Sequence, residues 1–179
     1  FALIAATEFG CRVTAITLSA QQCAWARRTL YEAGLADRIE VRLEDYRDVQ
    51  GNFDKIASIE MFEAVGEAYW PLFFEILRDR LRPGGQAAMQ VITIEEDRFA
   101  TYRRRTDFIQ RYIFPGGMLP TLRHIEAEAA RAGLSLANVT PFGASYARTL
   151  KLWNKAFQNA WPTVARLGFD ERFKRMWEF

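Results

Sequence analysis

The spacing of hydrophobic positions changes repeatedly along this chain, and the changes predict strands and helices in alternation. Apolar, β-branched runs typical of buried strands occupy residues 12–17, 39–43, 55–59 and 86–94. Amphipathic helical patterns lie between them, at residues 1–8, 19–33 and 67–81. Gly10 and Gly34 follow the last helical position of two of these segments, as C-terminal caps commonly do, and Pro83-Gly84-Gly85 is predicted to close the third. This order predicts a doubly wound α/β sheet.

The alternation is interrupted at residues 95–120. An arginine-rich helical stretch there leads into Arg111–Pro120. This segment is rich in turn residues and aromatic residues, and it is too apolar for a loop that only connects two elements. We therefore predict a substrate lid. Further elements are predicted at residues 122–132 (helix), 134–139 (strand), 146–160 (helix) and from 171 onward (helix). No linker or internal repeat divides the chain, so we expect one domain over residues 1–179.

Charge and composition limit the classes of partner that we expect for this protein. The chain has 24 Lys and Arg against 22 Asp and Glu, which gives no electrostatic argument for nucleic acid as the main partner. Basic residues crowd 98–111 and 166–175, where they form either solvated helix faces or a surface for an anionic partner. Cys11, Cys23 and the single histidine lack metal-ligand spacing, and reduced thiols favour a cytoplasmic protein. No run reaches membrane-spanning length, although docking on a bilayer is possible.

The candidate chemistry lies in the segment Ser58-Ile59-Glu60-Met61-Phe62-Glu63-Ala64-Val65-Gly66, directly after a predicted buried strand. Ligands of parallel sheets bind where the strands reach their carboxyl ends. Glu63 falls at that edge beside aromatic residues, which predicts a site built around its carboxylate. The alternative is that Glu63 serves the first turn of the next helix, where amide groups favour negative charge.

Three segments together carry a resemblance to a known family: Ile16 to Gln22, Ser58 to Gly66, and Arg111 to Pro120. In this order and spacing they resemble the cyclopropane-fatty-acyl-phospholipid synthase and mycolic acid cyclopropane synthase family of S-adenosylmethionine-dependent methyltransferases. The resemblance runs through essentially the whole chain. It implies a Rossmann-like class I methyltransferase sheet, with residues 95–120 as a helical lid inserted in the catalytic domain.

The resemblance also implies a binding site for S-adenosylmethionine. The residues that match its cofactor-binding positions are Thr17, Leu18, Ser19, Gln22, Glu44, Asp45, Ser58 and Ile59. Hydroxyl, amide and carboxylate groups suit the ribose, the methionine portion and the adenine amine. Ser19 and Gln22 also form a capping-box pattern, and Glu44 read alone is an exposed loop acid.

The reaction implied is methyl transfer to the cis double bond of an unsaturated phospholipid acyl chain, through a carbocation that closes a cyclopropane ring. The family's base is a bound bicarbonate. Glu63, Tyr146 and Ile92 match positions that hold it, and Gln90 stands where the family has a histidine. An amide still donates a hydrogen bond but does not titrate near neutral pH. Aromatic and apolar candidates for substrate contact, which can also stabilise a cation, are Phe62, Tyr112, Phe114 and Met118.

Several expectations follow from the same resemblance. The family's glycine-rich loop, first strand and bicarbonate-binding cysteine belong before Phe1, and its last strand belongs after Phe179, so we expect a fragment truncated at both ends that binds cofactor poorly and lacks activity. We expect peripheral contact with the inner membrane surface through Arg103 to Arg105, and a homodimer is possible. The alternatives are a methyl-branched product, a small-molecule N-methyltransferase and a non-catalytic α/β module.

Overall fold

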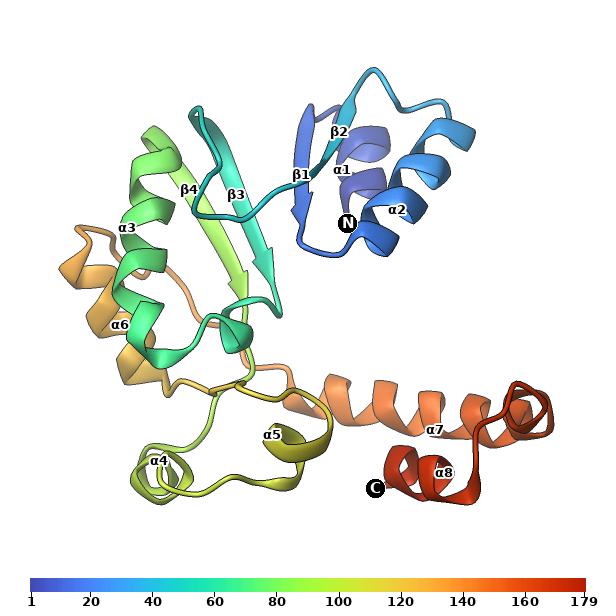
Figure 1. Cartoon of the computed structure of the whole chain (residues 1–179). Coiled ribbons are helices and arrows are strands. Elements are labelled where there is room, and N and C mark those ends of the chain that lie inside the picture. The colour runs from blue at the N-terminus through green and yellow to red at the C-terminus, as the bar shows by residue number, and fades with distance from the viewer. The chain divides into compact units, whose positions relative to one another are not determined.

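A computed structural model describes residues 1–179. The chain packs into two compact units, Phe1–Leu136 and Ala137–Phe179. The first unit holds all four strands, which are parallel, together with helices α1 to α6 (Figure 1). The second unit holds helices α7 and α8. The predicted α/β class with parallel strands is confirmed.

The strands form two separate parallel pairs instead of one continuous sheet. Strand β1 (Val13–Thr17) pairs with β2 (Ile39–Leu43), and β3 (Phe53–Ile59) pairs with β4 (Leu81–Gln90). The expected crossover units are therefore present. Strands β1 and β3 each keep one edge without a neighbouring strand.

Helices α1 (Ala2–Phe9) and α2 (Ala20–Glu32) pack with the first pair of strands. Gly10 ends α1 in the left-handed conformation, with φ of 66°, which glycine adopts without a steric penalty. Ser19 begins α2, because its side chain accepts a hydrogen bond from the Gln22 amide at 3.2 Å. A small core fills the space between helices and strands; it consists of Ala6, Cys23, Leu30, Ile39 and Val41.

The second pair of strands is covered by α3 (Trp70–Arg80) and α6 (Leu122–Arg131) (Figure 1). Aromatic rings dominate this larger core: Phe62 stacks on Trp70 with ring centroids 5.6 Å apart and also contacts Phe73 and Phe74. Such rings are worth about 0.5–1.5 kcal/mol per pair beyond the area they bury. This core supports the turn that follows β3, since Phe62 belongs to both.

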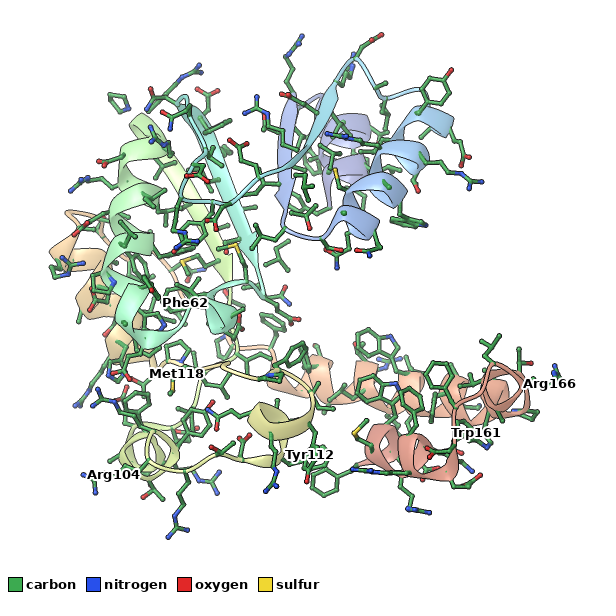
Figure 2. The ribbon with its side chains drawn as sticks, viewed as in Figure 1. Phe62, Arg104, Tyr112, Met118, Trp161 and Arg166 are labelled. Carbon is green, nitrogen blue, oxygen red and sulfur yellow. The ribbon has the colours of Figure 1, made fainter.

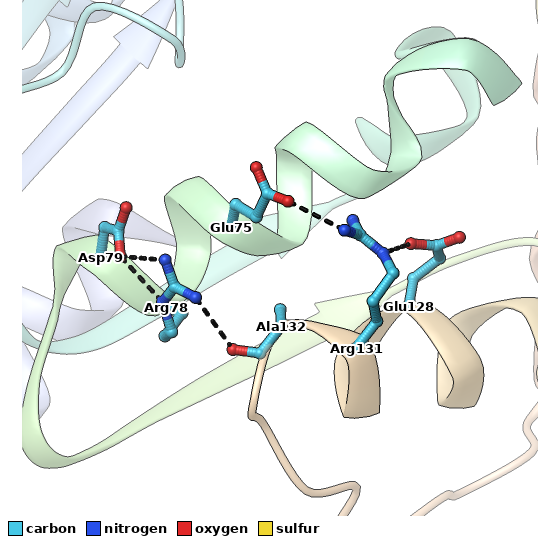
Figure 3. A network of polar contacts seen from close by, with 6 residues as sticks. All are labelled: Glu75, Arg78, Asp79, Glu128, Arg131 and Ala132. Atoms are coloured by element: carbon cyan, nitrogen blue, oxygen red, sulfur yellow. Dashed lines mark hydrogen bonds and ion pairs between the residues drawn. The ribbon is translucent and has the colours of Figure 1, made fainter.

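A polar network joins α3 to α6 at the rim of the aromatic core (Figure 3). The Arg131 guanidinium donates to Glu75 on α3 and to Glu128 on its own helix, both at 2.9 Å. Arg78 donates to the Ala132 carbonyl at 3.4 Å. The charged side chains are half exposed or less, and ion pairs this accessible to water contribute little to stability.

Strand β4 departs from the expected boundaries. It begins at Leu81 and runs through Pro83-Gly84-Gly85, which were predicted to separate helix from strand, and it ends at Gln90 instead of residue 94. The pairing slips between Phe53↔Leu81 and Lys55↔Gln86, so the proline and glycines form an irregularity inside the strand. Its earlier end leaves residues 91–94 as a connection at the carboxyl edge of the sheet.

The predicted strand at residues 134–139 does not form. Its apolar residues are half exposed, with Leu136 at 43% and Val139 at 48%, and no strand lies beside them to complete a hydrogen-bonded ladder. Residues 95–120 contain two short helices, α4 (Glu96–Tyr102) and α5 (Phe108–Tyr112), followed by a turn. The helical character predicted for this insertion is confirmed.

The second unit is a pair of helices, α7 (Gly143–Arg166) and α8 (Glu171–Glu178). Phe173 on α8 contacts Phe157 on α7, with ring centroids 6.5 Å apart, and Phe169 in the turn, at 4.4 Å. Asp170 begins α8 by accepting a hydrogen bond from the Phe173 amide at 2.8 Å. No helix of the chain combines the length and apolar character needed to cross a bilayer.

Candidate functional site

The carboxyl ends of β3 and β4 hold the side chain on which the predicted site centres. Glu63 lies in a 3-10 turn, Phe62–Ala64, which follows β3, and its Oε1 accepts a hydrogen bond from the Ile92 backbone amide at 2.6 Å. Its other oxygen, Oε2, is buried and has no hydrogen-bond partner. A buried carboxylate oxygen without a partner is costly unless a ligand satisfies it. The structure thus brings Glu63 and Ile92 together, as the resemblance implied.

A second acidic residue at this edge, Glu60, did not enter the predicted site. Its Oε1 accepts a hydrogen bond from Gln90 Nε2 at 2.9 Å, and its backbone amide donates to the Gln90 carbonyl at 2.9 Å. Glu60 is the single non-glycine residue with positive φ, at 49°. This conformation costs on the order of 1–3 kcal/mol and persists where the surroundings enforce it, often at functional sites. The sequence could have indicated Glu60, because it is an acid directly after a predicted strand. Its backbone conformation could not be predicted from the sequence.

The predicted lid is tied to the backbone of Glu63. The Met118 amide donates to the Glu63 carbonyl at 2.9 Å, and Gln110 Nε2 donates to the Gly117 carbonyl at 2.9 Å. Gly117 also sits close to the chain before it, because a Cβ there would lie 3.1 Å from the Phe114 carbonyl oxygen. These hydrogen bonds therefore fix the turn at residues 113–118 next to Glu63.

The four residues expected to contact substrate have different environments. Phe62 is 1% exposed and points into the aromatic core, so its contacts are those of packing (Figure 2). Met118 is partly buried against that core. Tyr112 and Phe114 are 46% and 67% exposed, which leaves their rings available to an apolar ligand. Contact with substrate therefore stays a prediction for the lid residues Tyr112, Phe114 and Met118. Phe62 instead supports the site from within the core.

Polar groups gather at the carboxyl end of β1. The Thr17 hydroxyl donates to Gln22 Oε1 at 2.9 Å and accepts from the Ser19 amide at 3.1 Å. The Gln22 side chain therefore turns to Thr17, and only the Ser19 half of the predicted capping box forms. Leu18 projects outward and is 74% exposed. The arrangement offers hydroxyl and amide groups on a turn between strand and helix.

The ends of β2 and β3 supply the remaining cofactor candidates. Glu44 Oε2 is buried and accepts no hydrogen bond, although it forms an ion pair with the Arg42 guanidinium at 3.6 Å. Asp45 is held by Arg47, whose side chain and backbone amide lower the pKa of this carboxyl. Ser58 is buried and its Oγ also lacks a partner. Unsatisfied polar atoms at the ends of two strands are a signature of a ligand site at a sheet edge.

The other predicted residues lie as follows. Ile59 is 48% exposed at the end of β3. Tyr146 lies on α7 in the second unit, and its role stays a prediction. Two open hollows on the surface are lined by other residues, one around Asp97 and Tyr102 and one around Arg27 and Tyr31. No group of three or more histidine, cysteine or acidic side chains is arranged to hold a metal ion.

Comparison with known proteins relates the chain to one family. The family model described as mycolic acid cyclopropane synthetase matches residues 1–179. Tuberculostearic acid methyltransferase UfaA1 of Mycobacterium tuberculosis is 42% identical over 98% of this chain and 41% of the relative. Cyclopropane-fatty-acyl-phospholipid synthase of Escherichia coli is 33% identical over 97% of this chain and 43% of the relative.

Solved structures extend the comparison to the fold. Mycolic acid cyclopropane synthase CmaA1, complexed with SAH and CTAB, superposes with a TM-score of 0.89 at 24% identity, over 98% of this chain and 65% of that one. Cyclopropane synthase MmaA2 from Mycobacterium tuberculosis gives 0.86 at 26% identity, over 97% and 64%. The chain spans about two fifths of the length of the two curated relatives.

Proposed function

Because the chain belongs to the mycolic acid cyclopropane synthetase family, we propose that the protein carrying it transfers a methyl group from S-adenosylmethionine to an unsaturated lipid acyl chain. The observation that carries this proposal is the carboxylate of Glu63, anchored by the Ile92 amide at the carboxyl edge of the sheet, with one buried oxygen left unpaired. A site that develops a carbocation needs negative charge and a proton acceptor at close range.

The residues present fit the cofactor. Glu44 Oε2, which has an ion pair with Arg42 but no hydrogen bond, and the unpaired Ser58 Oγ lie at the ends of β2 and β3 and match a nucleoside that offers an amine and hydroxyl groups. Thr17, Ser19 and Gln22 would hold the ribose and methionine portions. Asp45 is committed to Arg47, so Glu44 is the better candidate for the adenine amine. When bound, the cofactor supplies an electrophilic methyl group on a sulfonium.

The chain's own groups would then act on the acceptor. Tyr112 and Phe114 on the lid offer exposed rings to an acyl chain, and desolvated rings stabilise a cation by about 0.5–2 kcal/mol each. The lid stays beside the site, since the Met118 amide donates a hydrogen bond to the Glu63 carbonyl. The negative Glu63 carboxylate stabilises the positive charge that develops on the chain. Bicarbonate as the base, with Tyr146 helping to hold it, stays a prediction.

Unsaturated phospholipid is the proposed acceptor, and a cyclopropane ring the proposed product. Two exposed arginines support contact with a membrane surface. The side chains of Arg104 and Arg105 are exposed and form no ion pair, whereas Arg103 is paired with Glu67 at 2.8 Å (Figure 2). Each basic residue near an anionic bilayer contributes about 1 kcal/mol. The same proposal places the protein at the inner membrane surface and includes its assembly as a homodimer.

Mass spectrometry of lipids tests this function directly. Cells producing the protein that carries this chain, and cells producing its Glu63→Gln variant, are compared for acyl chains heavier by one methylene group. Hydrogenation then distinguishes the products, because a ring resists it and an exocyclic methylene does not. A saturated methyl-branched chain also takes up no hydrogen, but it is heavier than the ring product by two hydrogen atoms, so its mass distinguishes it. If no lipid gains mass while a panel of small amines is methylated, the acceptor assignment is refuted.

A further inference from the structure

A hollow of about 450 Å³ beside helix α4 is lined by charged side chains that the proposed chemistry does not use. It lies within residues 94–107, and its charged lining consists of Asp97, Arg98, Arg105 and Asp107. Asp97, Arg98 and Arg105 form no ion pair and no side-chain hydrogen bond, whereas Asp107 uses one carboxylate oxygen to cap α5. Two guanidiniums and two carboxylates therefore line one hollow without neutralising one another.

The hydrogen-bond donors of the hollow lie along one stripe of the chain. The Arg105 amide donates to the Tyr102 carbonyl at 3.2 Å, which continues the helical turn past the end of α4. Arg98, Tyr102 and Arg105 therefore follow the spacing i, i+4, i+7, which puts three side chains on the same side of a helix. Arg104 does not line the hollow and extends outward from this segment (Figure 2).

Tyr102 connects the hollow to the turn beside Glu63. Its hydroxyl oxygen accepts a hydrogen bond from the Leu119 amide at 3.2 Å, and the preceding amide, that of Met118, donates to the Glu63 carbonyl at 2.9 Å. Burial raises the pKa of this phenol, and the charge of Asp107 adds to that effect. The Tyr102 hydroxyl therefore keeps its proton at neutral pH and can donate it to a ligand in the hollow.

We propose that this hollow binds the head group of a zwitterionic phospholipid that carries a primary amine; the assignment rests on the lipid methyl transfer proposed above and names the head group of its acceptor. The phosphate accepts hydrogen bonds from Arg98, Arg105 and Tyr102, because planar guanidiniums match the geometry of phosphate oxygens. The ammonium donates to Asp97 and to the second carboxylate oxygen of Asp107. A head group with negative charge alone is disfavoured, because it would meet two carboxylates.

The position of the hollow favours a lipid over a soluble phosphodiester. The same insertion carries the rings of Tyr112 and Phe114, which are exposed to an apolar ligand. A phospholipid has its phosphate next to its acyl chains, so a single molecule offers partners to both the charged hollow and the aromatic rings. A soluble phosphodiester offers partners to the hollow alone.

The test is binding to vesicles in the absence of S-adenosylmethionine, so that the result does not depend on turnover. The protein that carries this chain is sedimented with vesicles of equal phosphatidylglycerol content, whose remaining lipid is either phosphatidylethanolamine or phosphatidylcholine. Both of these lipids are zwitterionic, but only the ammonium of ethanolamine has N–H groups that can donate to a carboxylate. The wild type is expected to bind the phosphatidylethanolamine vesicles about 10-fold more tightly, which is the effect of one hydrogen bond between charged groups.

Three variants separate recognition of the head group from general attraction to a charged surface. Arg98→Gln should lower the affinity for phosphatidylethanolamine vesicles about 10-fold, because the phosphate loses a charged donor. Asp97→Asn should reduce the preference for phosphatidylethanolamine over phosphatidylcholine, because the ammonium loses a charged acceptor. Arg104→Gln, the matched control, removes the same charge as Arg98→Gln but no group of the hollow, so it should keep the wild-type preference. All three positions are exposed, so each variant is expected to fold.

Free glycerophosphoethanolamine distinguishes the two sources of the ligand. In excess it should lower the affinity of the wild type for phosphatidylethanolamine vesicles to the value for phosphatidylcholine vesicles. If it binds the wild type but not Arg98→Gln while the two vesicle affinities are equal, the hollow takes a soluble phosphodiester and the lipid assignment is overturned.

The remaining outcomes separate the head-group site from the proposed function. Equal affinity of the wild type for the two vesicles, or an Arg98→Gln variant that binds as the wild type does, overturns the site. A protein that forms heavier lipid but lacks the preference overturns the site and leaves methyl transfer standing. A protein that shows the preference but forms no heavier lipid refutes the proposed function, and the hollow then binds a lipid that is not an acceptor.

Discussion

Replacing Glu63 with glutamine should separate chemistry from cofactor binding. The Ile92 amide now donates to a carboxylate at 2.6 Å, and hydrogen bonds to charged groups are worth about 1.5–3 kcal/mol against about 0.5–1.5 kcal/mol for neutral ones. If the glutamine oxygen keeps this bond, its NH2 group takes the place of Oε2, which is buried and has no partner. We expect a loss of about 1–2 kcal/mol in stability and a Tm lower by about 2–8 °C.

Turnover should fall by about 100-fold or more, because the charge beside the developing cation is removed. The small loss of stability would not account for a decrease of this size. Affinity for S-adenosylhomocysteine should be unchanged, since Glu63 is not among the residues expected to hold the cofactor. Release of S-adenosylhomocysteine measured with lipid vesicles gives kcat, and titration calorimetry gives the affinity. Glu67→Gln, which removes an acid paired with Arg103 four residues along, is the control. A Glu63→Gln variant with turnover within about twofold of wild type would refute the reasoning.

Three further predictions concern the core, the cofactor side and the surface. Trp70→Ala should lower the free energy of unfolding by about 3–5 kcal/mol in urea titration, and Trp70→Phe should cost less, because it also removes a buried indole N–H that has no partner. Arg47 lowers the pKa of Asp45 in the folded protein from its ordinary value of 3.8, so this carboxylate stabilises the fold above that pH. The stabilisation is lost as the pH falls from 3.8 through the folded pKa. Asp45→Asn should therefore make stability less dependent on pH in this acid range. Reversing Arg104 and Arg105 to glutamate should weaken binding to anionic vesicles at low salt, whereas Arg12→Glu, at another exposed arginine, should not; equal affinities would exclude this contact.

Local patterns were enough for most elements of the first unit. Strand β2 has the predicted bounds, and Gly10 and Ser19 end and begin their helices where the sequence placed them. These features depend on side-chain periodicity and on backbone preferences within a few residues, which a single sequence carries. The placement of Glu63 at the carboxyl edge also followed, because any residue just after a buried parallel strand reaches that edge.

Contacts between distant segments decided the rest. The apolar run at 134–139 has strand character, but no neighbouring strand is present to share its hydrogen bonds. Phe62 reads as a site residue in sequence, yet the turn after β3 directs its ring into the core made by α3.

The pairing of Glu60 with Gln90 is the clearest case. The two residues are thirty positions apart, and only the parallel register of β3 with β4, which sets Ile59 opposite Gln90, brings the acid and the amide together. The sequence by itself determined most helices and strands of the first unit and which edge carries the acids. Tertiary structure decided which acid each donor meets, because hydrogen-bond partners are chosen by strand register and not by spacing along the chain.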